Sequence, residues 1–500
     1  MKHTVWLSLL VTGALLAGCA TTQVKNPVTG RTESTVMDEA AELAEGRKAH
    51  QEILAEYGAY ADPKVQAYVN DIGQKLARLS HRSDLQWTFT VLDSPQVNAF
   101  ALPGGFVYVT RGIMTYMESE ADLAGVIGHE IGHVTARHGA QRATRQQKAG
   151  IGVLAATVLG VLIEGATGMS GAADIAGQVS QAAAAGYVAS YSREQELQAD
   201  RLGAEYLARA SYNPRNMIDV ITVLKNQERF AADQARAAGR EPPGGTDWLS
   251  SHPSNDQRLA EIQKRAAAYQ GQAAWGDDQR NRYLRAIDGL PYGESREQGV
   301  TRGRNFYHEP LGIALTAPQG WGVDNSPSAI TIANEAGDAG LVIQLVPPKA
   351  GTAHDEILRN LFKPADGKVE RGTINGLAAT HFQGTVRNKQ GASQPVIATV
   401  VSGPQSRHYI MLYAAKDAAA LRRAFGQMNE AERSFRPLSA ADRSAARPYA
   451  VRLVPYPRGG FAELARRSPQ PQSAEAQLRL INGNYGGGEP KVGELVKVIE

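Results

Sequence analysis

Three residues within an apolar stretch have the types and spacing of a metal-dependent hydrolytic site. They are His129, Glu130 and His133 in the sequence HEIGH. Residues four apart lie on one face of a helix, so the two histidines can place their imidazoles on one metal ion. Glu130 points to the edge of that site, where a carboxylate can take a proton from a water held by the metal. These residues predict a catalytic metal centre with Glu130 as its base.

The surrounding sequence predicts the helix that this spacing requires. Apolar residues recur at helical spacing at Leu123, Val126, Ile127, Ile131 and Val134. Ser119 and Asp122 predict a capping box at the helix start, and Gly139 predicts its end. The alternative is a pair of surface histidines beside a chance glutamate, and the apolar context argues against it.

A catalytic zinc site needs a third protein ligand. The helical sequence that follows Ser192 offers two carboxylates on one face, because Glu196 and Asp200 are four residues apart. Glu196 could complete a set of two histidines and one glutamate, while Asp200 accepts the free N–H of one histidine. The alternative is a charged helix that faces solvent.

Together with a third motif, these residues resemble the gluzincin family of zinc metallopeptidases that includes BepA/HtpX-like and CAAX prenyl endopeptidase-like proteins. The matching elements are NAFALPGG at 98–105, HEIGH at 129–133 and SREQELQAD at 192–200. The resemblance implies hydrolysis of peptide bonds with one Zn²⁺ per chain. It also implies that His129, His133 and Glu196 are the zinc ligands.

Strands are predicted upstream of the metal motif, at Leu85 to Leu92 and on both sides of Pro103-Gly104-Gly105. In zinc peptidases of this type, an edge strand beside the metal binds substrate backbone through main-chain hydrogen bonds. Asn98 and Ala99 are therefore predicted substrate contacts. The alternative is an ordinary hairpin.

His252 lies on a loop before a predicted helix, in a sequence that resembles the family's HPxxxxR element and ends at Arg258. It could reach the zinc as a fourth ligand in a closed state, or donate to the tetrahedral intermediate in an open one. The alternative is a surface histidine at a helix start. Arg258 is expected to anchor this loop.

The first residues predict export and lipidation. Residues 1–18 have an early lysine and an apolar stretch too short for a membrane span, which predicts a signal peptide. Leu16-Ala17-Gly18-Cys19 resembles the lipobox of bacterial lipoproteins, so Cys19 is predicted to carry the lipid anchor. Ala20 indicates sorting to the outer membrane, with the protein facing the periplasm. Cys19 is also the only cysteine, which excludes an internal disulfide.

Length and composition indicate several globular domains of the α+β class. The chain has 500 residues, of which 43% are hydrophobic and 21% charged. A net charge of +3, without a basic run interleaved with aromatic residues, argues against a nucleic-acid partner. The predicted division is a tether at 19–34, a mainly helical zincin-type protease domain with a small β-sheet at 35–286, a small α/β domain at 300–437 and a C-terminal module at 447–500.

Resemblances for the other parts are more limited. The 300–437 region resembles PsbP/Mog1-like α/β domains, and 447–500 resembles a LysM-like peptidoglycan-binding repeat. Arg458-Gly459-Gly460 departs from the usual LysM turn, so a structural cap is the alternative for this module. The apolar run at 149–163 is shorter than the roughly twenty residues that a bilayer core requires, and predicts a helical lid or a helix resting on the membrane or on the core.

These interpretations lead to one expected function and two alternatives. The expected protein is a lipid-anchored, periplasmic zinc metalloendopeptidase that hydrolyses unfolded or misassembled envelope proteins as quality control. One alternative is a chaperone-like outer-membrane assembly factor that holds clients with little proteolysis. The other is a peptidoglycan-associated scaffold.

Overall fold

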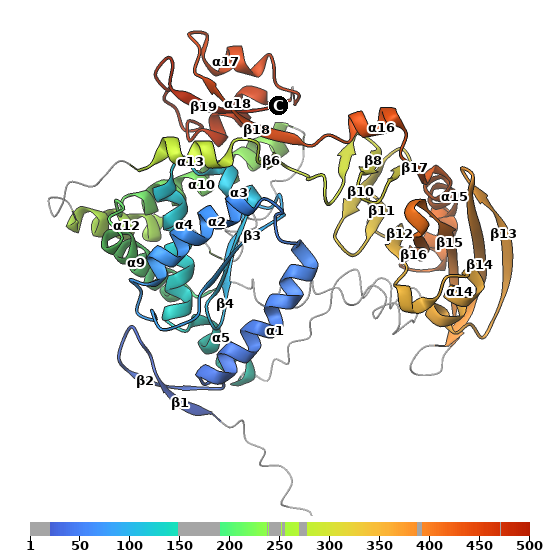
Figure 1. Ribbon diagram of the computed structural model, residues 1–500, viewed down its shortest axis with the longest axis horizontal. Helices are drawn as coiled ribbons and strands as arrows, with labels where there is room; N and C mark the ends of the chain where they lie inside the picture. Colours follow the sequence, from blue (N-terminus) through green and yellow to red (C-terminus); the bar gives the residue numbers. More distant parts are fainter. Residues whose placement is uncertain are drawn as a thin grey trace, which may run out of the picture.

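The structure, a computed structural model, describes residues 21–148, 191–237, 239, 252, 256–269, 278–387, 393–470 and 472–500. The predicted signal peptide, Cys19 and the apolar run at 149–163 lie outside these residues. The described residues combine helices with several sheets, which confirms the α+β class. Figure 1 shows a mainly helical part in blue and green, a strand-rich part in yellow and orange to its right, and a red C-terminal part above the helical part.

The helical part surrounds a small sheet. Its helices are α1 (Glu39–Tyr57), α2 (Pro63–Ala77), α3 (Arg111–Tyr116), α4 (Glu120–Thr135), α5 (His138–Lys148), α9 (Arg193–Arg209), α10 (Asn216–Ala237), α12 (Asp256–Ala268) and α13 (Arg280–Ile287). The sheet has the order β3-β5-β4, from strands β3 (Thr88–Leu92), β4 (Ala99–Leu102) and β5 (Phe106–Thr110). Strands β4 and β5 form the predicted antiparallel hairpin. Strand β4 is thus an edge strand, and it packs beside α4.

Helix α4 contains the HEIGH motif and begins at the predicted cap. The Ser119 side chain accepts a hydrogen bond from the backbone N–H of Asp122, at 3.1 Å. The Asp122 carboxylate accepts from the backbone N–H of Glu118 instead of Ser119. The capping box is therefore only half formed, because the chain before Ser119 turns so that a different N–H faces the carboxylate.

The same helix ends earlier than predicted. It stops at Thr135, whereas the sequence predicts Gly139. Arg137 adopts a left-handed φ of 59°, with its guanidinium 3.3 Å from the Glu42 carboxylate and donating to the Met37 carbonyl at 2.7 Å. These tertiary contacts stabilise a chain reversal that usually requires glycine. Helix α5 begins directly after this reversal.

Small residues allow α4 and α9 to approach closely. A Cβ atom placed on Gly132 would lie 3.0 Å from the backbone oxygen of Ala199, and one placed on Gly203 would lie 3.1 Å from the backbone nitrogen of His129. Larger residues at these positions would push the two helices apart, because protein interiors are already close-packed. This close approach brings Glu196 on α9 to the histidines on α4.

Residues 22–35 form an ordered hairpin where the sequence predicts a tether. Strand β1 (Thr22–Lys25) pairs antiparallel with β2 (Thr32–Thr35). Buried Asn26 donates to the Ala136 carbonyl at 3.1 Å, and the Thr35 hydroxyl lies 3.2 Å from that of Thr144. The polar, turn-rich composition of this segment therefore reflects a tight turn held on the protease part, and the tether interpretation is wrong for 22–34.

The strand-rich part runs from Val300 to Pro437. One sheet has the order β17-β9-β8-β7, from β7 (Val300–Arg302), β8 (Asn305–His308), β9 (Ile313–Thr316) and β17 (Arg436–Pro437). The other has the order β10-β11-β12-β16-β15-β14-β13, from β10 (Trp321–Asn325), β11 (Ile330–Asn334), β12 (Ala339–Leu345), β13 (Asp366–Ile374), β14 (Leu377–Arg387), β15 (Ser393–Ser402) and β16 (His408–Ala415). Its helices are α14 (His354–Phe362) and α15 (Ala418–Ser434), followed by α16 (Ala440–Ala445).

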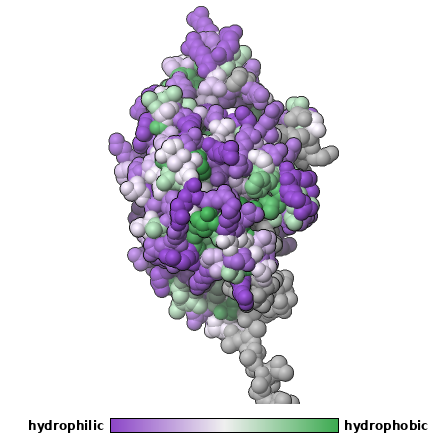
Figure 2. Space-filling model, turned by 90° about the vertical axis from the view of Figure 1, so that its right-hand side faces the viewer, coloured by the Kyte–Doolittle hydropathy of each residue, from purple (hydrophilic) through white to green (hydrophobic). Residues whose placement is uncertain are grey.

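Helices α14 and α15 pack on separate apolar clusters of the seven-stranded sheet. Figure 2 shows the outer face of this part as mainly hydrophilic, with small separated hydrophobic areas. Its exposed large apolar side chains are Leu345, Val369 and Phe425. Scattered exposed apolar residues are normal on a protein surface, so they do not by themselves mark a docking site.

The C-terminal part has the order strand, helix, helix, strand. Its elements are β18 (Tyr449–Pro455), α17 (Gly460–Ala465), α18 (Ala474–Ile481) and β19 (Leu495–Ile499). Strand β18 also pairs with β6 (Pro291–Tyr292), which precedes the strand-rich part. Apolar residues of this module, such as Phe461 and Ile481, belong to the same buried cluster as the residues of α4.

A buried lysine joins this module to the start of α4. The ammonium group of Lys497 donates to the carbonyls of Thr115 and Met117, at 3.0 and 2.7 Å, and lies 2.6 Å from a Glu118 oxygen. Glu118 directly precedes the cap residue of α4. This packing favours the structural-cap alternative for residues 447–500. No helix within the described ranges is long and apolar enough to cross a membrane.

Candidate metal centre

The three predicted metal ligands meet between α4 and α9. The Nε2 atoms of His129 and His133 lie 3.0 Å apart. Carboxylate oxygens of Glu196 lie 3.4 Å from each of these two nitrogens. All three side chains are about 1% exposed. The structure thus brings together residues from two distant motifs, with their ligand atoms facing one point.

The distances among these atoms fit a zinc ion. Zinc takes nitrogen and oxygen ligands at about 2.0–2.2 Å in a tetrahedron, which places neighbouring ligand atoms about 3.3–3.5 Å apart. The two separations of 3.4 Å between Glu196 oxygens and imidazole nitrogens match this geometry, and the 3.0 Å between the two imidazole nitrogens is a few tenths of an ångström shorter. Two imidazoles and one carboxylate are also a donor set found in catalytic zinc sites, which keep a further position open.

His252 occupies the remaining side of this cluster. Its Nδ1 lies 3.0 Å from a Glu196 oxygen and 3.2 Å from the His129 Nε2. The ligand atoms of the four residues all lie within 4.8 Å of one another. This is the arrangement expected of a closed state with His252 as a fourth ligand. The predicted role in an open state stays a prediction.

Glu130 lies at the edge of the cluster, as its position one residue after His129 predicts. It is fully buried, and its Oε1 lies 3.5 Å from the Nε2 of His252. A carboxylate in this position is close enough to exchange a proton with a group placed where the His252 ring now lies.

Asp200 and Arg258 contact the metal-ligand residues from outside the cluster. An Asp200 oxygen lies 2.9 Å from the Nδ1 of His129, as predicted. Arg258 is fully buried and donates to both Asp200 oxygens, at 2.7 and 2.8 Å. It also donates to the backbone oxygen of His252 at 3.1 Å, and its guanidinium lies 3.0 Å from Glu196. Arg258 therefore anchors the segment that carries His252.

Neighbouring histidines and Arg258 keep the Glu196 and Asp200 carboxylates ionised. Burial alone would raise the pKa of Glu196, but the adjacent His252, His129 and His133 outweigh it and hold that pKa well below its usual range. Burial likewise opposes the charge of Asp200, and the Arg258 guanidinium and the His129 hydrogen bond lower its pKa instead. A metal ligand and an acceptor for a ligand N–H both need this ionised form.

Two buried residues beside His133 were not predicted from the sequence. The Nδ1 of His138 lies 2.9 Å from the Nδ1 of His133, and the Tyr191 ring stacks on the His133 ring with centroids 3.8 Å apart. Burial lowers the pKa of His138 to about 4 and raises that of Tyr191 to about 12. No sequence signal marks His138, because only the reversal at Arg137 returns it to the site.

The predicted substrate contacts lie at the start of β4. The backbone N–H of Asn98 donates to the Thr110 hydroxyl at 3.1 Å, and its carbonyl accepts from the Thr110 N–H at 3.0 Å. Its side-chain oxygen is buried and has no hydrogen-bond partner within the part of the chain that the structure describes. Ala99 is buried in the adjacent position of the strand.

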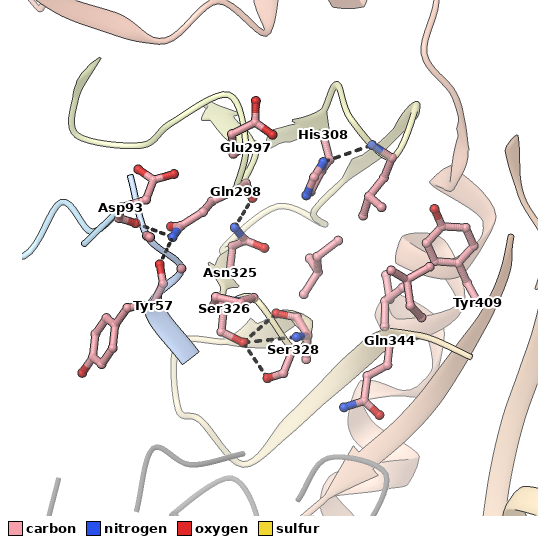
Figure 3. Close-up of a pocket in the computed structure, with 18 residues that line it drawn as sticks. Tyr57, Asp93, Glu297, Gln298, His308, Asn325, Ser326, Ser328, Gln344 and Tyr409 are labelled. Carbon is pink, nitrogen blue, oxygen red and sulfur yellow. Dashed lines mark hydrogen bonds between the residues drawn. The ribbon is translucent and has the colours of Figure 1, made fainter. Parts of the chain in front are cut away.

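A separate cavity of about 250 Å³ lies where the protease part meets the strand-rich part. Figure 3 shows Gln298 on one side of it, near Asp93 and Asn325. Gln298 donates to the backbone oxygens of Tyr57 and Asp93, while Asn325 donates to the Gln298 carbonyl. No metal-ligand cluster was found among its described residues. The hydrogen bonds of Gln298 connect the two parts beside this cavity.

The sequence profile of Peptidase family M48 matches residues 63–266, which include α4, α9 and the four clustered residues. These residues form a peptidase family M48 domain. The M48 domain lies within the predicted protease region 35–286. It confirms the resemblance to BepA/HtpX-like metallopeptidases.

Curated relatives cover the M48 domain and some flanking sequence. The beta-barrel assembly-enhancing protease of Yersinia pestis is 30% identical over 275 residues, which are 53% of this chain and 53% of that protein. The protein of the same name from Escherichia coli K12 is 30% identical over 205 residues, 41% of this chain and 39% of that protein. Mitochondrial metalloendopeptidase OMA1 of Schizosaccharomyces pombe is 28% identical over 261 residues, 50% of this chain and 70% of that protein.

The chain therefore spans about half, or less, of the length of the beta-barrel assembly-enhancing proteases that it matches. A solution structure of PsbP from Synechocystis sp. PCC 6803 aligns with 28% of this chain and 98% of that chain, at 14% identity and a TM-score of 0.20. A TM-score this low does not decide a fold. The PsbP/Mog1-like and LysM-like assignments outside the M48 domain stay predictions.

Proposed function

We propose that this chain is a zinc-dependent metalloendopeptidase with one zinc ion held by His129, His133 and Glu196. The observation that carries the proposal is the convergence of these ligand atoms at zinc-like separations beside the buried carboxylate of Glu130. The relatives with the names protease and metalloendopeptidase support the same activity.

In this proposal, zinc, Glu130 and Asp200 have separate roles in the hydrolysis of the peptide bond. Zinc, when bound, supplies a Lewis acid that makes a water molecule nucleophilic near neutral pH and polarises the scissile carbonyl. Glu130 takes the proton of the attacking water and passes it to the leaving amine. The Asp200 carboxylate lies 2.9 Å from the Nδ1 of His129 and would keep the hydrogen of the ring on that nitrogen, so that the Nε2 of this ligand keeps its lone pair for the metal.

We infer that substrates bind as an added strand along β4. Main-chain hydrogen bonds to an edge strand recognise extended backbone and ignore most side chains. Asn98 supports this role, because a buried amide oxygen without a partner among the described residues is uncommon and could accept a substrate N–H. A site that binds substrate through its backbone favours unfolded segments, because their main-chain groups are free to form these hydrogen bonds.

The proposed substrates are unfolded or misassembled envelope proteins. The name of the bacterial relatives refers to the assembly of β-barrels, which supports an envelope role. We propose that the protein acts as quality control from an outer-membrane lipid anchor at Cys19, facing the periplasm.

Removing the metal tests the proposed activity. Cleavage of unfolded casein is expected to fall to background after incubation with 1,10-phenanthroline, and to return when zinc is added in stoichiometric amount. Magnesium serves as the control, because a site of two imidazoles and one carboxylate favours zinc over this oxygen-seeking ion. Cleavage that survives complete removal of zinc would contradict the proposal.

His252 is expected to restrain the enzyme. The substitution His252→Ala removes the ring that lies against Glu196 and His129, so the fourth position opens to water. Basal casein cleavage should rise by roughly tenfold or more, because minor open states are typically populated at about 0.1–10%. His308→Ala, a histidine in the distant cavity, is the control and should leave the rate unchanged. A fall in cleavage would instead assign His252 to substrate chemistry.

One observation favours the chaperone-like alternative, namely that the described state has His252 in the position that an active site must open. In that case the edge of β4 would hold clients with little cleavage. The peptidoglycan-scaffold alternative has less support, since the module at 447–500 shares its core with the M48 domain.

A further inference from the structure

Each histidine in the proposed zinc site has a separate partner for its second ring nitrogen. For His129 the partner is the Asp200 carboxylate, at 2.9 Å. For His133 it is the ring of His138, also at 2.9 Å. We infer that His138 is a positioning residue that fixes the tautomer and ring orientation of His133 for the metal, and that Gln198 fixes His138 in turn. The inference rests on the proposed zinc site.

One assignment of protons fits both hydrogen bonds and leaves the Nε2 of His133 free to bind the metal. The Oε1 of Gln198 lies 3.1 Å from the Nε2 of His138. An amide oxygen only accepts, so with the Gln198 amide in this orientation the Nε2 of His138 carries the hydrogen, and in a neutral imidazole the Nδ1 is then the acceptor. The Nδ1 of His133 must therefore donate to it. The Nε2 of His133 is left with its lone pair directed at the metal cluster.

Packing restrains the same two rings. His138 is fully buried, and its ring stands at 71° to that of His133 with centroids 5.0 Å apart. The Tyr191 ring covers a face of the His133 ring, with an interplanar angle of 22°. A ring held by a hydrogen bond at one edge and by stacking on one face has little freedom to turn. Such restraint lowers the cost of ordering a ligand when the metal binds.

Two local features of the fold bring His138 and Gln198 to His133. The left-handed residue Arg137 reverses the chain after α4, so that His138 returns toward His133. Gln198 lies on α9 between Glu196 and Asp200, and the close approach of α4 and α9 brings its side chain to His138. Helix α9 therefore supplies both the metal ligand Glu196 and Gln198, which holds His138.

Zinc affinity tests the inference without reference to proteolysis. We expect His138→Leu to weaken zinc binding by about 10–100-fold, measured by competition with a fluorescent zinc chelator, because outer partners of ligand histidines typically contribute that much. Gln198→Leu, which acts through His138, is expected to weaken zinc binding in the same assay. Gln198→Glu retains an acceptor at the same place and is expected to keep the wild-type affinity.

His81→Leu is the matched control. This histidine also bonds a buried partner through Nδ1, the Tyr206 hydroxyl at 2.8 Å, but it does not contact the metal ligands. It should leave zinc affinity unchanged while lowering thermal stability. If His138→Leu does not fold, the half-buried Gln198 provides the decisive variant. Wild-type zinc affinity in Gln198→Leu would overturn the inference, whereas a wild-type protein that binds no zinc would overturn the proposed function instead.

Discussion

Casein cleavage by Glu130→Gln is expected to fall by about 10²- to 10⁴-fold, the usual contribution of a general acid–base residue. The substitution keeps the size of a fully buried side chain and replaces a carboxylate, which can accept a proton, with a neutral amide, which cannot. Zinc content and thermal stability should stay at the wild-type level. Initial rates measured at equal zinc loading would isolate the loss to the chemical step.

The same pair of proteins separates a protease from a chaperone-like factor. If wild type and Glu130→Gln both cleave casein at background rates but suppress aggregation of an unfolded client, the chaperone-like alternative gains support. Cleavage by Glu130→Gln at the wild-type rate would show that the catalytic base lies elsewhere.

The variant Arg258→Met is expected to lose about 3–5 kcal/mol of unfolding free energy, the typical cost of removing one partner from a buried ion pair. Its guanidinium is enclosed with the Asp200 and Glu196 carboxylates, at 2.7 and 3.0 Å. Without the arginine, these charges stay buried with less compensation. The loss should be larger after zinc is chelated, because zinc also compensates Glu196.

Arg209→Met on the same helix is the matched control for this prediction. Arg209 pairs with Glu205 at the surface, and exposed pairs contribute about 0–1 kcal/mol. Urea unfolding of both variants, with and without chelator, provides the comparison. Equal stability of Arg258→Met and Arg209→Met would contradict the assigned role of Arg258.

The metal centre could be predicted because its geometry follows from helical spacing. His129 and His133 are four residues apart on one helix, and Glu196 and Asp200 are four apart on another. Spacing alone permitted Glu196 as a ligand, and the family resemblance selected it. Close packing of glycines on α4 and α9 then brings the two motifs together.

Features that depend on contacts between distant segments could not be predicted. The reversal at Arg137 needs Glu42 and Met37, and without it His138 would not return to the site. Residues 22–34 look like a linker by composition, yet Asn26 fixes them to the end of α4. A local pattern does not reveal which remote partner a polar side chain will find.

The C-terminal module shows the same limit. Its alternation of strand and helix could be read from the sequence, whereas its attachment could not. Lys497 is a single charged residue within a strand, and only the folded chain shows it buried against the loop before α4. This contact favours the structural-cap alternative, while the LysM-like assignment stays a prediction.

Zinc content of purified wild type and Glu196→Ala, measured by plasma mass spectrometry, tests the central claim most directly. About one zinc ion per chain is expected in the wild type, and almost none in a Glu196→Ala variant that keeps its helix content, because a three-ligand site that loses its carboxylate holds zinc poorly. Zinc retained in full by Glu196→Ala, or absent from the wild type, would contradict the account.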